Sequence, residues 1–326
     1  MAMFFQAARR GNNAFYRYLL TILCVFIAAL IGQIPLVVAV GVATSKDGLG
    51  AGELEAFQQS MDFSILGIGQ NLALFFVLLA FAAALGMLYL CVRFLHRKRF
   101  TDILTGRQRL DWKRVGFSFG FWMVLSGALE VVGYLQDPGN YTWQFNLRLF
   151  LPLLLISLVM LPLQTTFEEA IFRGYLMQGL GLLFRNRWLP LLLTSVAFGA
   201  LHIANPEIKQ FGLGLMMPYY IGFGLLMGIC TLMDEGTELA LGLHAATNIY
   251  GATVVSFAGS ALQTPALFRL GALDTSNILP ASLAISLFFL MVAARRYGWH
   301  GWGRLFGKLS FEPEPSADEP ADEENV

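Results

Sequence analysis

The chain has 326 residues, of which 56% are hydrophobic and only 13% are charged, and its formal net charge is zero. A soluble domain needs about a quarter of its residues charged to cover its surface, so this composition excludes a soluble domain and predicts a protein of the lipid bilayer. The zero net charge gives no basic signature for nucleic acid, and we expect no nucleic-acid partner.

Long apolar segments follow one another along the chain. A transmembrane helix needs roughly 20 mostly apolar residues. We predict eight such helices, at residues 18–44, 64–94, 115–135, 147–178, 188–203, 211–233, 239–258 and 279–297. The fourth contains Pro152 and Pro162 and is expected to kink there, and the fifth is short. The predicted fold class is all-α, a polytopic transmembrane helical bundle of about eight spans.

Basic residues predict the orientation, because cytoplasmic loops are enriched in Lys and Arg. Such residues precede the first predicted helix and fill the loop 95–114, whereas the loop 45–63 carries four acidic residues and one lysine. We therefore expect both termini in the cytoplasm, in a bacterial inner membrane. The expected parts are a cytoplasmic segment 1–17, a transmembrane domain 18–298 and an acidic, disordered cytoplasmic tail 299–326.

Two carboxylates and a guanidinium lie inside the fourth predicted helix, in the run FEEAIFRG at 167–174. A charge at the bilayer centre costs at least about 2–3 kcal/mol on insertion scales, and it usually faces the bundle interior. Glu169 and Arg173 are four residues apart, so they share a helix face and can pair. Glu168 points to another face and stays free to act as a general base. The alternative is a charged interfacial turn.

Two further polar elements lie in later helices. Phe198 and His202 are one helical turn apart, although His202 alone could simply end its helix. His244 and Asn248 are also four apart, with small residues between them; His can move protons and Asn can donate to a developing oxyanion. The alternative is interhelical hydrogen bonding that only holds the bundle together. Three such elements on three helices favour one functional site around a polar cavity.

These three elements, in this order and each on its own predicted helix, resemble the motifs of the CAAX-protease and bacteriocin-processing (CPBP, or Abi) family of intramembrane proteases. The matching residues are Glu168, Glu169, Arg173, Phe198, His202, His244 and Asn248. The resemblance covers about 104–258. It implies a hydrolase that cleaves a peptide or membrane-protein substrate within or near the bilayer; in eukaryotic members the substrate is a prenylated CAAX terminus.

The resemblance also implies a role for each residue. Glu168 would activate the attacking water, and His202 would assist it. His244 and Asn248 would stabilise the oxyanion. The supporting residues would be Glu169, Arg173 and Phe198. A metalloprotease is the other possibility within the family, in which Glu168, His202 and His244 would hold Zn²⁺ with an open position, although no His-Glu-x-x-His is present.

A serine-hydrolase motif match is disfavoured, and two other functions stay open. The run GFSFG at 116–120 matches the serine-hydrolase elbow, but that motif needs a strand–turn–helix context; Gly-x-x-x-Gly helix packing is the preferred interpretation there and at Gly224 and Gly228. A catalytically inactive scaffold or immunity protein on the same fold would keep its phenotype when Glu168 is mutated. A proton-coupled transporter could use Glu130, which is alone in the third predicted helix.

The depth of the candidate residues sets a geometric condition. Counted at 1.5 Å per residue, His202 lies toward the outer end of its helix, and Glu168 lies toward the cytoplasmic end of its own. The two residues must meet for a single site to form. We expect a kink at Pro162 and a fourth helix that extends inward beyond the membrane to bring them level.

Overall fold

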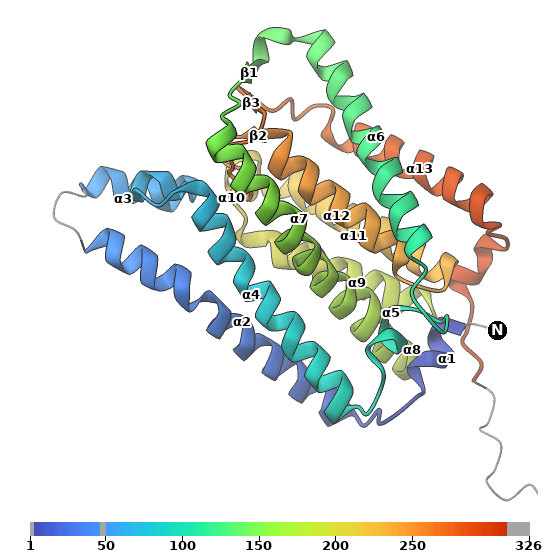
Figure 1. The fold of residues 1–326 in the computed structure, drawn as a ribbon. Coiled ribbons are helices and arrows are strands. Elements are labelled where there is room, and N and C mark those ends of the chain that lie inside the picture. The colour runs from blue at the N-terminus through green and yellow to red at the C-terminus, as the bar shows by residue number, and fades with distance from the viewer. Residues whose placement is uncertain (1–2, 46–49, 312–326) are drawn as a thin grey trace, which may run out of the picture.

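The computed structural model describes residues 3–45 and 50–311, which form a helical bundle (Figure 1). The long helices are α2 (Phe15–Thr44), α4 (Gln70–Leu90), α6 (Trp112–Gln136), α7 (Leu147–Glu169), α11 (Leu213–Asp234) and α13 (Ile278–Tyr297). The shorter helices are α1 (Met3–Ala8), α3 (Ala51–Ser60), α5 (Phe100–Leu104), α8 (Met177–Phe184), α9 (Trp188–Leu201), α10 (Pro206–Phe211) and α12 (Glu238–Thr253). The predicted all-α polytopic bundle is confirmed.

Within the described residues, six helical segments are long and apolar enough to cross a bilayer. They are Phe15–Thr44, Gln70–Leu95, Trp112–Gln136, Leu147–Phe184, Leu213–Asp234 and Ile278–Tyr297. The apolar segment Trp188–Ala204 is shorter, and α12 has 16 residues. All eight predicted segments are thus helical, but two of them are short for a full crossing, and the number of eight spans stays a prediction.

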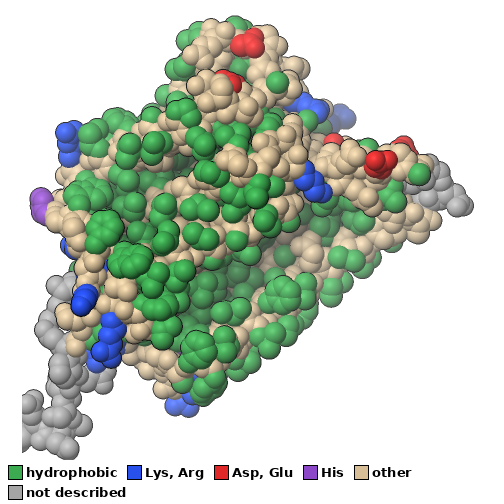
Figure 2. Space-filling model, turned by 180° about the vertical axis from the view of Figure 1, so that it is seen from behind, with side chains coloured by type: hydrophobic (Ala, Val, Ile, Leu, Met, Phe, Trp, Pro, Cys, Tyr) green, Lys and Arg blue, Asp and Glu red, His purple; other side chains and the backbone are tan. Residues whose placement is uncertain are grey.

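The outer surface of the bundle is apolar. Large hydrophobic side chains such as Phe26, Val37 and Leu155 are more than half exposed on α2 and α7. Figure 2 shows hydrophobic side chains across the middle of one face, with charged side chains at its margins. Soluble proteins rarely expose a contiguous apolar surface of this kind. The chain is therefore an integral, multi-pass membrane protein.

Helix α12 lies inside the bundle, where it packs against α6, α7 and α11 (Figure 1). All of its residues from 238 to 246 are buried. Gly242 permits the approach of α6, because a Cβ atom there would lie 2.2 Å from the Val115 carbonyl oxygen. One turn along α6, Ser118 donates its hydroxyl hydrogen to the Leu239 carbonyl at 2.5 Å. Ser118 is thus a packing residue, which agrees with the rejection of a serine nucleophile.

The two predicted glycine pairs differ in their packing. Gly224 and Gly228 of α11 face α9, where an added Cβ atom would come within 3.1 Å and 2.4 Å of neighbouring atoms. Close helix packing is confirmed there. At Gly116 and Gly120 of α6 an added Cβ would meet nothing within 4 Å, so that prediction is wrong. The close contact of α6 instead uses a glycine on its partner helix, which the spacing within α6 could not reveal.

Three short strands, which the hydropathy pattern did not predict, form a small sheet at one end of the bundle (Figure 1). They are β1 (Tyr141–Trp143), β2 (Val255–Phe257) and β3 (Phe268–Leu270), in the order β1-β3-β2. β3 pairs antiparallel with β1 and parallel with β2. The Tyr141 hydroxyl donates to Glu130 Oε1 at 2.7 Å. The lone carboxylate of α6 therefore has a partner beside this sheet.

The opposite end of the bundle is closed by α1, a helix within the predicted cytoplasmic segment. Phe4 and Phe5 are buried, and α1 packs against α5 and α8. The Phe4 backbone N–H donates to Glu235 Oε2 at 2.9 Å. Residues 299–311 also pack at this end, with Trp299, Leu305 and Leu309 buried, so the expectation of a disordered tail is wrong for these residues. The remainder of the predicted tail, 312–326, lies outside the described residues.

Candidate active site

The fourth predicted helix is longer than a membrane span. α7 runs through Pro152 and Pro162 and passes through a π-helical turn, Ala170–Leu176, into α8. The whole run Leu147–Phe184 has 38 residues, or about 57 Å against a hydrocarbon core of roughly 30 Å. A helical run of this length exceeds the hydrocarbon core, as expected for the fourth helix, whereas the kink at Pro162 and a common depth of Glu168 and His202 stay predictions.

Glu169 and Arg173 form the predicted ion pair. Both side chains are fully buried, and Arg173 Nη1 lies 2.9 Å from Glu169 Oε1. Arg173 Nη2 also donates to the Gly224 carbonyl of α11 at 3.2 Å. The predicted contact is confirmed, with the addition that the guanidinium joins α7 to a second helix. The pair lies at the start of the π-helical turn, a feature that is frequent at functional sites.

His244 of α12 lies between the two carboxylates. Its Nδ1 atom is 2.7 Å from Glu169 Oε1, and its Nε2 atom is 3.4 Å from Glu168 Oε2. Because a carboxylate oxygen accepts, the Nδ1 atom carries the hydrogen of that bond. The sequence analysis predicted Arg173 as the partner of Glu169 and named no second partner. In the structure, one oxygen of Glu169 accepts from both Arg173 and His244.

Gln164 connects Glu168 to Asn248 and was missed by the sequence analysis. Its Nε2 donates to Glu168 Oε1 at 3.1 Å, and its Oε1 accepts from Asn248 Nδ2 at 3.1 Å. The signal was present, since Gln164 lies four residues before Glu168 and shares its helix face. The other carboxylate oxygen, Glu168 Oε2, is buried and has no hydrogen-bond partner within the described part of the chain.

His202 lies at the end of α9, where the helix tightens into a 3₁₀ turn, His202–Ala204. Its Nδ1 donates to the Phe198 carbonyl at 2.8 Å. Its ring stacks on the Tyr220 ring of α11, with centroids 4.3 Å apart. After Gln164, Tyr220 is the second residue of this site that the sequence analysis missed. Among the described residues, His202 makes no hydrogen bond to Glu168 or His244, and the Phe198 ring contacts both histidines.

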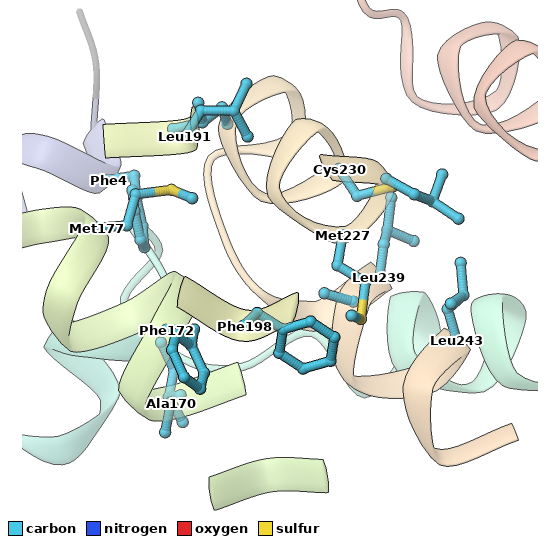
Figure 3. Close-up of a cluster of buried hydrophobic side chains, with 14 of the residues drawn as sticks. Phe4, Ala170, Phe172, Met177, Leu191, Phe198, Met227, Cys230, Leu239 and Leu243 are labelled. Carbon is cyan, nitrogen blue, oxygen red and sulfur yellow. The ribbon is translucent and has the colours of Figure 1, made fainter. Parts of the chain in front are cut away.

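Aromatic rings form the apolar wall of this group. The Phe198 ring lies 4.7 Å from the His202 ring and 5.8 Å from the His244 ring, and the Arg173 Cζ atom lies 4.3 Å above it. Phe172 meets Phe198 edge to face at 5.7 Å. Figure 3 shows these two phenylalanines side by side in a buried hydrophobic cluster. Surroundings of this kind lower the local dielectric constant and strengthen interactions between charges.

The four candidate catalytic residues thus come from three helices and meet in one region. Glu168 contacts His244 directly and Asn248 through Gln164, while His202 adjoins His244 through the Phe198 ring. Scattered positions, each with a separate neighbour, would have indicated bundle packing alone. The polar cavity expected among them stays a prediction.

The suggested zinc ligands do not fit a metal site. Within the described residues, no group of three or more His, Cys, Asp or Glu side chains is placed to hold a metal ion. His244 uses Nδ1 for Glu169 and directs Nε2 at Glu168, and His202 uses Nδ1 for its own helix backbone. One nitrogen of each histidine is thus already engaged with a protein acceptor.

Comparison with known proteins agrees with the motif positions. The family model described as type II CAAX prenyl endopeptidase Rce1-like matches residues 148–250, which include every candidate catalytic residue. The chain is also similar to a Bacillus subtilis (strain 168) protein named uncharacterized protein YyaK, with 30% identity over 244 residues, or 74% of this chain and 78% of that protein. No solved structure matches the chain.

Proposed function

Because the chain belongs to the type II CAAX prenyl endopeptidase Rce1-like family, we propose that it is an intramembrane endopeptidase that hydrolyses a bond in a peptide or membrane-protein substrate. One observation carries the proposal. The buried oxygen Glu168 Oε2 has no hydrogen-bond partner among the described residues, yet it lies 3.4 Å from an imidazole that Glu169 holds in place. A carboxylate so placed is suited to proton transfer.

Glu168 is the proposed general base. Gln164 holds its Oε1 atom, which leaves Oε2 to take a proton from a water molecule. The water oxygen then forms a bond to the carbonyl carbon of the scissile peptide. Glu168 returns the proton to the amide nitrogen as the C–N bond breaks. One water molecule is consumed, and the products are a new carboxyl end and a new amino end.

His202 is proposed to orient that water. Its Nδ1 hydrogen is donated to the Phe198 carbonyl, so Nε2 of the neutral ring carries a lone pair. This lone pair can accept the second hydrogen of the water while Glu168 takes the first. The Phe198 ring contacts both His202 and His244, and His244 Nε2 lies 3.4 Å from Glu168 Oε2, which supports the action of these groups in one site.

His244 and Asn248 are proposed to stabilise the oxyanion. Glu169 accepts from His244 Nδ1 and thereby fixes the orientation of the ring, so that an Nε2–H hydrogen, when the ring carries one, can donate to developing negative charge. Asn248 donates one amide hydrogen to Gln164 and has a second one to offer. Arg173 neutralises Glu169, so that this carboxylate can support His244 without adding net negative charge at the oxyanion.

The alternatives receive less support from the contacts. A transporter was suggested by Glu130, but that carboxylate accepts from Tyr141 beside the β-sheet and makes no contact with the Glu168 group. An inactive scaffold would not need Glu168, His202, His244 and Asn248 to come together from three helices. We also propose that both termini face the cytoplasm of a bacterial cell, with the protein in the inner membrane, because its basic loops favour that side.

The experiment uses purified full-length protein in lipid nanodiscs with internally quenched peptides, both free and farnesylated at a C-terminal CAAX sequence. Cleavage in ¹⁸O-labelled water should place one ¹⁸O atom in the new carboxyl end, detected by mass spectrometry. Glu168→Gln keeps the acceptor for Gln164 but cannot take a proton, and it should lower the rate by roughly 10²–10⁴-fold.

The control is His300→Gln, which changes an exposed histidine outside the site and should cleave like the wild type. If Glu168→Gln cleaves at the wild-type rate, or if no peptide in either class is cleaved, the endopeptidase proposal is wrong and the scaffold becomes the leading function.

A further inference from the structure

A second buried carboxylate lies close to His202 and takes no part in the proposed reaction. Glu207 of α10 is 8% exposed. Its Oε1 accepts from the Ala261 backbone N–H at 2.7 Å, in the segment that follows α12 and β2. Its Oε2 is buried without a hydrogen-bond partner in the described ranges, and burial raises the pKa of this carboxyl. Glu207 therefore joins the chain after His202 to the chain after His244 and Asn248.

Tyr220 connects the segment that contains this carboxylate to the histidine. Its hydroxyl accepts from Asn205 Nδ2 at 3.3 Å, and Asn205 is the residue immediately before α10. Its ring is nearly parallel to the His202 ring, at 25° between planes and 4.3 Å between centroids. Both ends of the tyrosine are thus engaged, the ring with His202 and the hydroxyl with Asn205.

His202 needs a contact of this kind. Its single hydrogen bond runs from Nδ1 to Phe198, a residue of its own helix, and the imidazole can still rock about that bond. The Phe198 ring limits this motion, at 4.7 Å, but it belongs to the same helix. Tyr220 supplies a flat contact from another helix, and stacked aromatic pairs are stabilising beyond the area they bury.

We propose that Tyr220 is a positioning residue that fixes the plane and tautomer of His202, and that Glu207 anchors the α10 segment on which this arrangement depends. The consequence for catalysis rests on the proposed function. The effect on the His202 ring does not, and it can be measured in a protein that cleaves nothing.

The first measurement is ¹⁵N NMR of histidine-labelled full-length protein in nanodiscs, with His202 assigned by its loss in His202→Gln. The wild type should hold His202 in the Nδ1–H tautomer. Tyr220→Leu should lower the ratio of Nδ1–H to Nε2–H tautomer by roughly three- to tenfold, the size expected from one aromatic contact. Tyr220→Phe keeps the ring and should match the wild type.

Tyr89→Leu is the matched control, because it removes a tyrosine from an aromatic pair with Phe100 elsewhere in the bundle. It should leave the His202 signals unchanged. For the anchor, Glu207→Gln keeps an acceptor for Ala261 and should preserve the tautomer, whereas Glu207→Ala should shift it as Tyr220→Leu does. An unchanged tautomer in Tyr220→Leu, or an equal change in Tyr89→Leu, overturns the inference.

Cleavage provides the second measurement. Tyr220→Leu should lower kcat about tenfold with little change in KM, since a misplaced catalytic group slows the chemical step, and Tyr220→Phe should restore the rate. Wild-type cleavage that depends on Glu168, combined with an unaffected Tyr220→Leu, would reject the role of Tyr220 and leave the endopeptidase proposal standing. If Tyr220→Leu changes the tautomer of His202 but the wild type cleaves nothing, the role of Tyr220 is supported and the endopeptidase proposal is rejected.

Discussion

Oε1 of Glu169 lies 2.7 Å from Nδ1 of His244, although the two residues are 75 positions apart in the chain. The same oxygen is 2.9 Å from Arg173 Nη1. A carboxylate that was predicted to serve only its own helix therefore also holds the histidine of another. This arrangement gives the proposed oxyanion donor a fixed orientation, and it makes the stability of the bundle and the geometry of the site depend on the same buried charge.

Glu169→Ala should strongly destabilise the protein. The substitution leaves the fully buried Arg173 guanidinium without its counter-charge, and removing one partner of a buried ion pair costs about 3–5 kcal/mol. Thermal unfolding in detergent measures the effect. The double variant Glu169→Gln with Arg173→Met removes both charges and should unfold at a higher temperature than Glu169→Ala. Equal unfolding of Glu169→Ala and the wild type would show that the pair does not stabilise the bundle.

Gln164→Leu should reduce cleavage without unfolding the protein. It removes the side chain that donates to Glu168 Oε1 and accepts from Asn248, so both groups lose their alignment. We expect kcat to fall by about 10²-fold, in line with a displacement of about 1 Å in a catalytic group. Gln144→Leu, at the sheet end of the bundle, is the control and should keep the wild-type rate. A Gln164→Leu enzyme with normal kcat would exclude this positioning role.

Chelation should leave cleavage unchanged. The described His, Cys, Asp and Glu residues form no metal-holding group, and the proposed reaction uses the Glu168 carboxylate directly. Purified enzyme is incubated with 1,10-phenanthroline or EDTA and assayed, and its metal content is measured in parallel. A loss of activity that added Zn²⁺ restores, together with a stoichiometric metal, would reinstate Glu168, His202 and His244 as ligands.

The stability of the protein should fall with decreasing pH because of His96. This residue is fully buried; its Nδ1 donates to the Asn12 carbonyl and its Nε2 accepts from the Tyr175 hydroxyl, both at 2.7 Å. Burial lowers the pKa of His96 below its ordinary value of 6.5. Below that value the unfolded state binds more protons than the folded state, so the free energy of unfolding decreases as pH falls.

The measurement is the unfolding temperature between about pH 8 and pH 5, the range in which histidine changes charge. His96→Gln cannot take up a proton, and its curve should be flatter on the acidic side than that of the wild type. Parallel curves for the two proteins would assign the acid sensitivity to other groups.

Gly242→Ala should destabilise the contact between α12 and α6. The added methyl group would lie 2.2 Å from the Val115 carbonyl oxygen, and overpacking of this kind costs about 1–3 kcal/mol. Gly251→Ala is a matched control on the same helix, where the added methyl meets nothing within 4 Å. Since Ala favours helix over Gly by up to about 1 kcal/mol, Gly251→Ala should be neutral or stabilising. Similar unfolding temperatures for the two variants would contradict this packing.

The pairing of Glu169 with Arg173 was predictable because it depends on helix geometry alone, and four residues make one turn of any α-helix. The same reasoning could have found Gln164 beside Glu168. The contacts of His244 with both carboxylates, and of Tyr220 with His202, could not be found in this way, since they depend on how two helices are rotated and how deep each lies. The prediction that Gly116 and Gly120 of α6 make a close helix contact failed for the same reason, since the glycine at that contact is Gly242 of α12.

The sequence by itself determined that this chain is a membrane-embedded helical bundle and which polar residues are candidates for chemistry. Both conclusions follow from local properties, namely the length of apolar runs and the presence of ionisable groups within them. Only the tertiary structure decided that Glu169 holds His244 and that Gln164 joins Glu168 to Asn248. Those contacts join residues of different helices, or depend on the rotamers that such packing selects, and hydrophobic spacing carries no information on either.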